Sequence, residues 1–293
     1  MLDIFSIPLP ALFGQLLLGL INGAFYAMLS LGLAVIFGML NVINFTHGAQ
    51  YMLGAFAAWL MLTNLDIPFW ASLVLAPLIV GLFGVVIERL LLKRIYHLDH
   101  LYGFLLTFGL ALVIEGLFQW RWGSSGAPYP TPIPGGYNLG FMFMPAYRGF
   151  VVLAALVICL ATWYGIERTR LGAYLRAATE NPTLVRAFGI NVPRLITLTY
   201  GLGVALAALA GVLAAPIQQV SALMGTNLVL VVFAVVVIGG MGSIMGSIVT
   251  GFGLGLVEGF TKVVYPPASN TVIFFVMAIV LLVKPAGLFG QSK

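Results

Sequence analysis

Residues 195–257 read LITLTYGLGVALAALAGVLAAPIQQVSALMGTNLVLVVFAVVVIGGMGSIMGSIVTGFGLGLV, and none of these positions carries a charge. A second uncharged stretch covers residues 4–65. One helical crossing of a membrane takes about 20 apolar residues. Each stretch is therefore long enough for two or three crossings, and the sequence predicts an integral membrane protein with several spans.

The composition of the whole chain excludes a water-soluble domain. Of the 293 residues, 61% are hydrophobic and 7% are charged, whereas a soluble domain has about 25% charged residues. A single cysteine, Cys159, excludes an internal disulfide. On a soluble protein the net charge of +5 would favour nucleic acid. Here most basic residues lie between spans, where they set orientation, so we expect no nucleic-acid partner.

Apolar runs separated by charged or Pro/Gly-rich segments predict an all-α, polytopic fold with about 8–9 transmembrane helices in a single domain, 1–293. The predicted spans are 12–38, 48–63, 68–88, 101–120, 149–166, 195–215, 226–241, 246–264 and 270–284.

The placement of basic residues predicts the orientation of these spans. Segments 88–100 and 167–194 are rich in lysine or arginine, so the positive-inside rule places both in the cytoplasm, together with the C-terminus. Segment 121–148 has five prolines and five glycines and reads as an external loop. Counting back from residue 88 with three spans places the N-terminus outside. If the first apolar run forms two segments, or if 48–63 is re-entrant, the N-terminus lies inside instead.

Small residues recur every four positions in three of the predicted spans. Such spacing lets helix backbones approach closely in lipid, and we interpret the repeats chiefly as packing faces, with a substrate path as the alternative. The repeats are Gly203, Ala207, Gly211 and Ala215; Ser247, Gly251, Gly255 and Gly259; and Gly19, Gly23 and Ala27.

The segment Asn41-Val-Ile-Asn-Phe-Thr-His-Gly-Ala-Gln50 sets polar groups between two apolar runs. Non-helical polar backbone at membrane depth is tolerated only where it is buried in protein or lines a water-filled cavity. The polar residues of this segment either line a pathway or form a cytoplasmic turn, and the spacing favours the turn. No metal site is expected, because the other histidines, His97 and His100, fall in another segment.

The segment Val237-Ile-Gly-Gly-Met-Gly-Ser-Ile-Met-Gly-Ser247 interrupts an apolar stretch with four glycines and two serines. An interruption of this kind indicates a broken helix or a re-entrant turn, and in transporters these often lie near the substrate route.

Segment 167–194 predicts two helices on the cytoplasmic face. The first ends before Asn181-Pro182, because a residue that precedes proline avoids the α region. The second runs from Pro182 to Phe188, with Asn181 as N-cap and Gly189 in the left-handed C′ position. A short, capped, basic helix is suited to docking on a soluble partner. The alternative is a basic anchor that only fixes topology.

Charges within the spans have structural explanations. Glu258 and Lys262 are four residues apart, which favours an ion pair within one helix. Glu115 lies near the predicted outer interface and is expected to snorkel or accept hydrogen bonds rather than carry protons. None of the lysines follows a glycine, so the chain has no P-loop for ATP. We expect no enzymatic activity, no catalytic residue and no cofactor.

Over nearly its whole length the chain resembles the shorter permease subunit of branched-chain amino acid ABC importers, a type II-like fold with broken or re-entrant helices. The resemblance begins at Gly19-Leu-Ile-Asn-Gly-Ala-Phe-Tyr26 and ends at Lys284-Pro-Ala-Gly-Leu-Phe-Gly290. The blocks that carry it most specifically are Val42-Ile-Asn-Phe-Thr-His-Gly48, Gly172-Ala-Tyr-Leu-Arg-Ala177 with Phe188-Gly-Ile-Asn191, Ala210-Gly-Val-Leu213 and Gly239-Gly-Met-Gly-Ser-Ile244. Many relatives carry an acid directly after the His-Gly pair, where this chain has Ala49 and Gln50.

The resemblance implies a multi-pass subunit of the bacterial inner membrane that imports branched-chain amino acids. Its implied partners are a second, homologous permease, two cytoplasmic ATPases, an extracytoplasmic amino-acid-binding protein and membrane lipid. The residues implied in ATPase coupling are Arg170, Arg176, Glu180, Asn181, Pro182, Arg186, Gly189 and Asn191. Those implied along the translocation path are Asn22, Asn44, Phe45, His47, Gly48, Gly239, Gly240, Gly242 and Ser243.

Other functions remain as alternatives. A self-contained secondary transporter would need intramembrane acids for coupling, and only Glu115 and Glu258 are available. A permease for another small amino acid, an amide or urea would share the same blocks. A membrane scaffold without a transport role would bind no ATPase.

Overall fold

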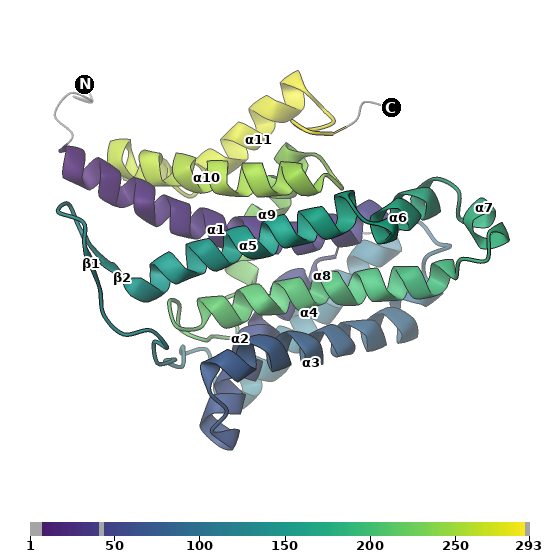
Figure 1. Ribbon diagram of the computed structural model, residues 1–293, viewed down its shortest axis with the longest axis horizontal. Coiled ribbons are helices and arrows are strands. Elements are labelled where there is room, and N and C mark those ends of the chain that lie inside the picture. The colour runs from purple at the N-terminus through teal and green to yellow at the C-terminus, as the bar shows by residue number, and fades with distance from the viewer. Residues whose placement is uncertain (1–7, 41–43, 291–293) are drawn as a thin grey trace.

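The computed structural model describes residues 8–40 and 44–290, and nearly all of its regular structure is helical (Figure 1). The α-helices are α1 (Leu9–Leu40), α2 (Thr46–Leu65), α3 (Phe69–Leu90), α4 (His100–Trp122), α5 (Ala146–Glu167), α6 (Arg170–Glu180), α7 (Pro182–Ala187), α8 (Val192–Ala214), α9 (Thr226–Gly239), α10 (Ile244–Val264) and α11 (Val272–Val283). Two short 3-10 helices, η2 (Leu92–Arg94) and η3 (Pro266–Ala268), lie in connections.

Every predicted span coincides with a helix, so the prediction of a helical protein with several spans is confirmed. By length and composition, six of the described helices can cross a membrane: α1, α3, α4, α5, α8 and α10. The apolar helices α9 and α11 are shorter than a full crossing, and α2 is less hydrophobic than each of those six helices. The predicted count of eight or nine crossings therefore remains a prediction.

Segment 121–148 contains structure that the all-α prediction lacks. Strand β1 (Gly136–Asn138) pairs with strand β2 (Phe143–Pro145) in an antiparallel hairpin. Each strand has three residues, too few to give an alternating pattern in the sequence. This hairpin and the α6–α7 segment lie at opposite ends of the molecule (Figure 1).

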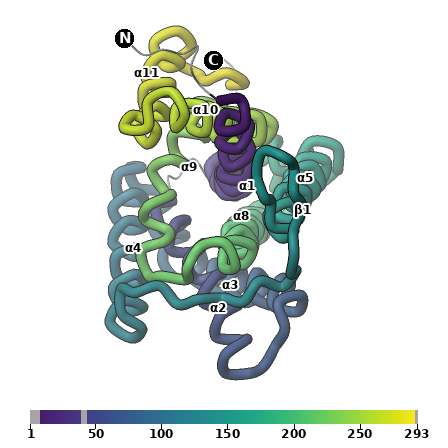
Figure 2. The backbone as a smooth tube through the Cα atoms, turned by 90° about the vertical axis from the view of Figure 1, so that its left-hand side faces the viewer, coloured from purple at the N-terminus to yellow at the C-terminus, as the bar shows by residue number. Residues whose placement is uncertain are grey.

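Burial separates a central layer of helices from a peripheral one. In the most apolar window of α1, 83% of residues are buried, against 17% in α5. Figure 2 places α4, α5 and α11 around the periphery, with α1 and α8 between them. The exposed side chains of the peripheral helices are mostly leucine, valine and phenylalanine. A surface of this kind is suited to lipid and would be unfavourable in water.

The small-residue repeats form packing faces, as predicted. The faces of α1 and α10 meet each other: a Cβ added to Gly23 would lie 3.0 Å from Phe252 Cα, and one added to Gly19 would overlap the Gly255 carbonyl. On α8, a Cβ added to Gly203 would lie 2.7 Å from the Gly32 carbonyl oxygen of α1. These helices approach backbone to backbone, which supplies the packing that lipid does not drive.

Helices α2 and α9 both begin inside the molecule. The Nε2 atom of His47, in the first turn of α2, donates to the Leu29 carbonyl at 2.9 Å, and Leu29 lies 11 residues before the end of α1 at Leu40. The start of α2 is therefore about 16 Å along the α1 axis from that end. Gly48 meets Gly225, the N-cap of α9, so both helices begin at the same level.

Candidate functional site

The α6–α7 segment forms as predicted from its caps. Helix α6 ends at Glu180, and the side chain of Asn181 accepts a hydrogen bond from the Leu184 backbone N–H at 2.9 Å, at the start of α7. Pro182 occupies the first turn of α7, where its missing N–H costs nothing. These local signals define two short helices with a fixed turn between them.

The end of α7 is equally well defined. Gly189 has a φ of +82°, a conformation that glycine adopts without the steric penalty of a Cβ. Two residues later, the side chain of Asn191 accepts from the Arg194 backbone N–H at 3.1 Å and caps α8. The connection between α7 and α8 is thus short, and the helix end on each side of it is well defined.

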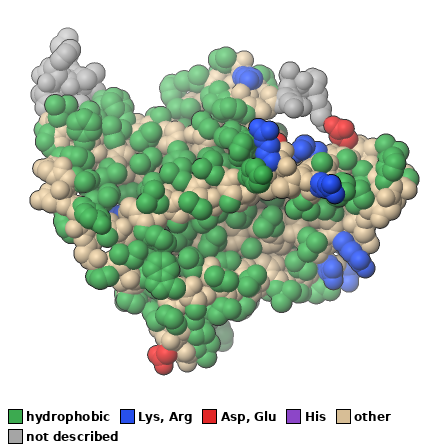
Figure 3. Space-filling view, viewed as in Figure 1, with side chains coloured by type: hydrophobic (Ala, Val, Ile, Leu, Met, Phe, Trp, Pro, Cys, Tyr) green, Lys and Arg blue, Asp and Glu red, His purple; other side chains and the backbone are tan. Residues whose placement is uncertain are grey.

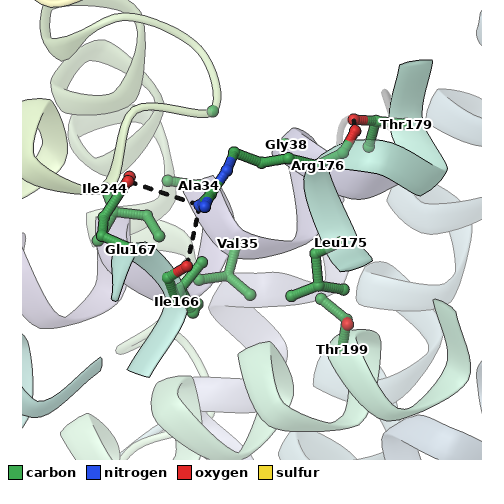
Figure 4. A pocket seen from close by; sticks show the side chains of 11 residues that line it. Ala34, Val35, Gly38, Ile166, Glu167, Leu175, Arg176, Thr179, Thr199 and Ile244 are labelled. Atoms are coloured by element: carbon green, nitrogen blue, oxygen red, sulfur yellow. Dashed lines mark hydrogen bonds and ion pairs between the residues drawn. The ribbon is translucent and has the colours of Figure 1, made fainter. Parts of the chain in front are cut away.

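Arg176 reaches back to the end of α5, although 53% of its side chain stays exposed (Figure 4). Its guanidinium donates to the Ile166 carbonyl at 3.0 Å and lies 3.5 Å from the Glu167 carboxylate. On the same side of α6, Gly172 packs directly on the Ile166 carbonyl. These contacts fasten α6 to the end of α5, so Arg176 positions the segment. It also lines a small cavity of about 100 Å³ whose other walls include Ala34 and Gly242.

The outward face of the segment combines charge with unpartnered apolar side chains. Arg170, Glu180 and Arg186 are exposed, and lysine and arginine side chains gather at this end of the molecule (Figure 3). On and beside α7, Leu184 is 53% exposed and Phe188 is 76% exposed. An aromatic anchor beside arginine is typical of the centre of a protein interface.

A buried polar layer surrounds the start of α2. The Asn44 side-chain amide donates to Gln50 Oε1 at 3.3 Å, and the Gln50 amide donates to the Tyr200 hydroxyl of α8 at 3.2 Å. With His47 bonded to Leu29, these side chains are almost fully enclosed. The segment is therefore buried in protein, and of its described residues only Phe45 is partly exposed. The part at residues 41–43 lies outside the described residues.

Phe45 is at the edge of this layer. Its ring stacks on Phe233 of α9 with centroids 4.5 Å apart, and its backbone N–H donates to Thr107 Oγ1 of α4 at 3.2 Å. The neighbouring hydroxyl of Thr46 donates to the Thr107 carbonyl at 3.0 Å. The start of α2 therefore contacts α4, α8 and α9.

The Gly239–Ser243 turn lies at the other end of α9. Gly240 and Gly242 have φ values of +103° and +85°, which require glycine in practice. The Ser243 hydroxyl accepts from the Gly246 backbone N–H at 3.1 Å and caps α10. The sequence prediction of a break between two helices is confirmed, and the turn packs against Gly38 of α1.

Asn22 belongs to a third, separate place. Its side-chain amide donates to Glu258 Oε1 at 3.4 Å, and the Tyr26 hydroxyl donates to Glu258 Oε2 at 2.6 Å. Lys262 pairs with the same carboxylate, as the spacing predicted. Glu115 also accepts a hydrogen bond, from Thr226 at 2.6 Å. The residues predicted along a path therefore fall into three groups at different levels of the molecule.

Comparison with known proteins identifies the family. The family described as branched-chain amino acid transport system, permease component, matches residues 15–283. The chain belongs to this family. BraD of Pseudomonas aeruginosa, a high-affinity branched-chain amino acid transport system permease protein, is 28% identical over 95% of this chain and 96% of its own. LivH of Escherichia coli K12, which carries the same description, is 27% identical with the same coverage.

A more distant similarity covers part of the permease. The ribose import permease RbsC of Escherichia coli K12 is 34% identical over 107 residues, which are 33% of each chain. The relatives are transport subunits and not enzymes, so this chain is a membrane transport permease. Within residues 8–40 and 44–290, no group of three or more His, Cys, Asp or Glu side chains could hold a metal ion.

Several residues of the permease's polar groups were missed by the sequence analysis. Thr107 and Tyr200 bind the start of α2 from distant helices, and nothing in their local sequence predicts it. Tyr26 could have been predicted, because it lies one helical turn after Asn22 and so shares its face of the helix. Glu88 was not considered either: it is buried and accepts from Thr197 at 2.7 Å.

Proposed function

We propose that this chain is one permease subunit of an ABC importer that moves branched-chain amino acids across the bacterial cytoplasmic membrane. Its partners would be a second, homologous permease, two cytoplasmic ATPases and an extracytoplasmic amino-acid-binding protein, with lipid around the spans. The family supports the cargo class. No P-loop is present in the sequence, so any ATP hydrolysis must come from partner subunits.

The observation that carries this proposal is the outward face of α7. Leu184 and Phe188 are exposed beside Arg186 at the end of the molecule that basic residues assign to the cytoplasm. Neighbouring exposed apolar side chains on a well-capped helix outside the bilayer are suited to a protein partner. An ATPase surface fits this position.

Coupling follows from how the segment is attached. A push on α7 reaches α5 through α6, because Arg176 and Gly172 hold α6 against Ile166. The same push reaches α8 directly through the capped turn at Asn191. Closure of the ATPases on ATP would therefore move spans as rigid bodies and switch the path between outward and inward access.

Charge reversal on α6 and α7 tests the proposal. In the reconstituted complex, Arg186→Glu should lower substrate-stimulated ATPase activity by about fivefold, because it places an acid in the docking face. Arg176→Glu should lower it as well, because it sets a second carboxylate beside Glu167 and loosens α6. Arg148→Glu, at the hairpin end of α5, is the control and should leave coupling intact.

Unchanged coupling in both α6–α7 variants would contradict the assignment of this segment. Uptake by the purified chain alone, driven by an ion gradient, would replace the proposal with secondary transport. Absence of any ATPase from the purified complex would favour a scaffold.

A further inference from the structure

The described part of the permease contains a cavity that combines a polar end with an apolar wall. Its volume is about 450 Å³, within the range of about 300–1,000 Å³ that small-molecule sites occupy. The cavity lies among α1, α9, α10 and α11, which neighbour one another in Figure 2. Its polar lining is Tyr26, Asn227, Glu258 and Asn270, and its apolar lining is Leu228, Leu230, Val231, Ile273 and Phe274.

Glu258 supplies a carboxylate at the cavity wall. The side chain is nearly enclosed, and it accepts hydrogen bonds from Tyr26 and Asn22 while pairing with Lys262. A buried carboxylate requires such partners. The Glu258–Lys262 pair is electrically neutral, so a neutral zwitterion can approach it without bringing net charge into the membrane interior.

The amides of Asn227 and Asn270 face the same cavity from other elements. Asn227 lies in the first turn of α9, and Asn270 precedes α11. Both residues are exposed, and within residues 8–40 and 44–290 neither side-chain amide makes a hydrogen bond to the chain. Each therefore has two N–H donors and a carbonyl oxygen available to a ligand.

We propose that this cavity binds a free apolar α-amino acid during its passage through the permease. The ammonium group pairs with Glu258, the carboxylate accepts hydrogen bonds from Asn227 and Asn270, and the side chain lies against the wall that includes Ile273 and Phe274. The assignment rests on the proposed import function and specifies where the cargo contacts this subunit. It needs both charged groups of the cargo, so leucine should bind, whereas 3-methylbutylamine and 4-methylpentanoate should not compete with it.

The first test compares two buried carboxylates in the complete complex, reconstituted with its binding protein. In Glu258→Gln the cargo loses its ion pair, and ATP-driven uptake of radiolabelled leucine should fall about tenfold or more, because a bond to a charged group is lost. Glu88→Gln is the matched control: that carboxylate also binds a tyrosine and a threonine, Tyr96 and Thr197, but lies outside the cavity. It should keep uptake within about twofold.

The second test fills the cavity without touching its charges. Phe274→Trp enlarges a wall residue and should reduce leucine uptake by about tenfold, because binding needs the volume it occupies. Phe275→Trp changes the next residue, which is 67% exposed and outside the lining, and should transport as the unaltered protein does. This pair remains informative if Glu258→Gln does not fold.

The outcomes separate the two proposals. Failure of the unaltered complex to import leucine with ATP would overturn the proposed function. ATP-driven import that is unchanged in both Glu258→Gln and Phe274→Trp would overturn the cavity assignment and leave the import function standing.

Discussion

The α1–α10 interface and the α6–α7 segment differ in how closely they contact the rest of the chain. At the interface, Gly19, Gly23 and Gly255 bring two backbones into contact with almost no side chain between them. In the segment, Leu184 and Phe188 project from a short helix and contact little of their own chain. The interface has no room for a larger side chain, whereas the segment leaves apolar surface exposed.

The difference separates parts that must stay together from parts that must meet another protein. Small residues give van der Waals contact in lipid, where no hydrophobic effect drives one helix onto another. Outside the bilayer, exposed apolar side chains gain free energy only when a partner covers them. We therefore expect substitutions at the interface to affect folding, and substitutions in the segment to affect coupling.

The largest effect is expected from Gly255→Leu in α10. A side chain there would meet the Gly19 carbonyl and the Gly23 backbone, and backbone atoms cannot rotate away. We expect a loss of about 3 kcal/mol or more in folding free energy. The yield of monodisperse protein in detergent and the midpoint of its thermal unfolding measure this.

Gly253→Leu is the matched control for that prediction. It adds the same side chain to the same helix, but nothing lies within 4 Å of a Cβ at Gly253. The expected change is within about 0.5 kcal/mol. Equal losses at the two positions would mean that the loss at Gly255 does not come from contact with α1.

A smaller effect is expected from Asn181→Ala at the start of α7. Loss of an N-cap costs about 1 kcal/mol, so α7 should fray, and hydrogen exchange at the Leu184 amide should rise about fivefold. Substrate-stimulated ATPase activity should fall by a similar factor, while the unfolding midpoint of the spans stays the same.

Asn138→Ala provides the comparison for this variant. Asn138 also accepts a backbone hydrogen bond, from Gly140 at 3.0 Å, but in the hairpin at the opposite end. It should leave ATPase coupling unchanged. A coupling defect of equal size in Asn138→Ala would show that the assay reports general destabilisation.

Local signals predicted α6 and α7 and the glycine faces from the sequence, because caps, prolines and small-residue spacing act over a few residues. Each span that hydropathy predicted coincides with a helix. The starts of α2 and α9 inside the molecule were not predicted, because an apolar composition does not encode depth. The spacing favoured a cytoplasmic turn around His47, and the structure instead buries this residue against α1.

The cavity was beyond sequence analysis for a related reason. The Glu258–Lys262 pair follows from i,i+4 spacing, but Asn227 and Asn270 reach it through folding of distant segments. Short strands such as Gly136–Asn138 give no period that a sequence reading can detect. Features that depend on contacts between residues far apart in the sequence could be found only in the structure.

The central claim is that α7 meets an ATPase, and site-directed crosslinking tests it most directly. Leu184→Cys, labelled with a maleimide benzophenone in the complete complex, should give a covalent adduct with the ATPase subunit on illumination. The native Cys159 is buried and should remain unlabelled. Tyr137→Cys in β1, 65% exposed at the opposite end, should give no such adduct. Absence of the ATPase adduct from Leu184→Cys in an intact, ATP-hydrolysing complex would contradict the account.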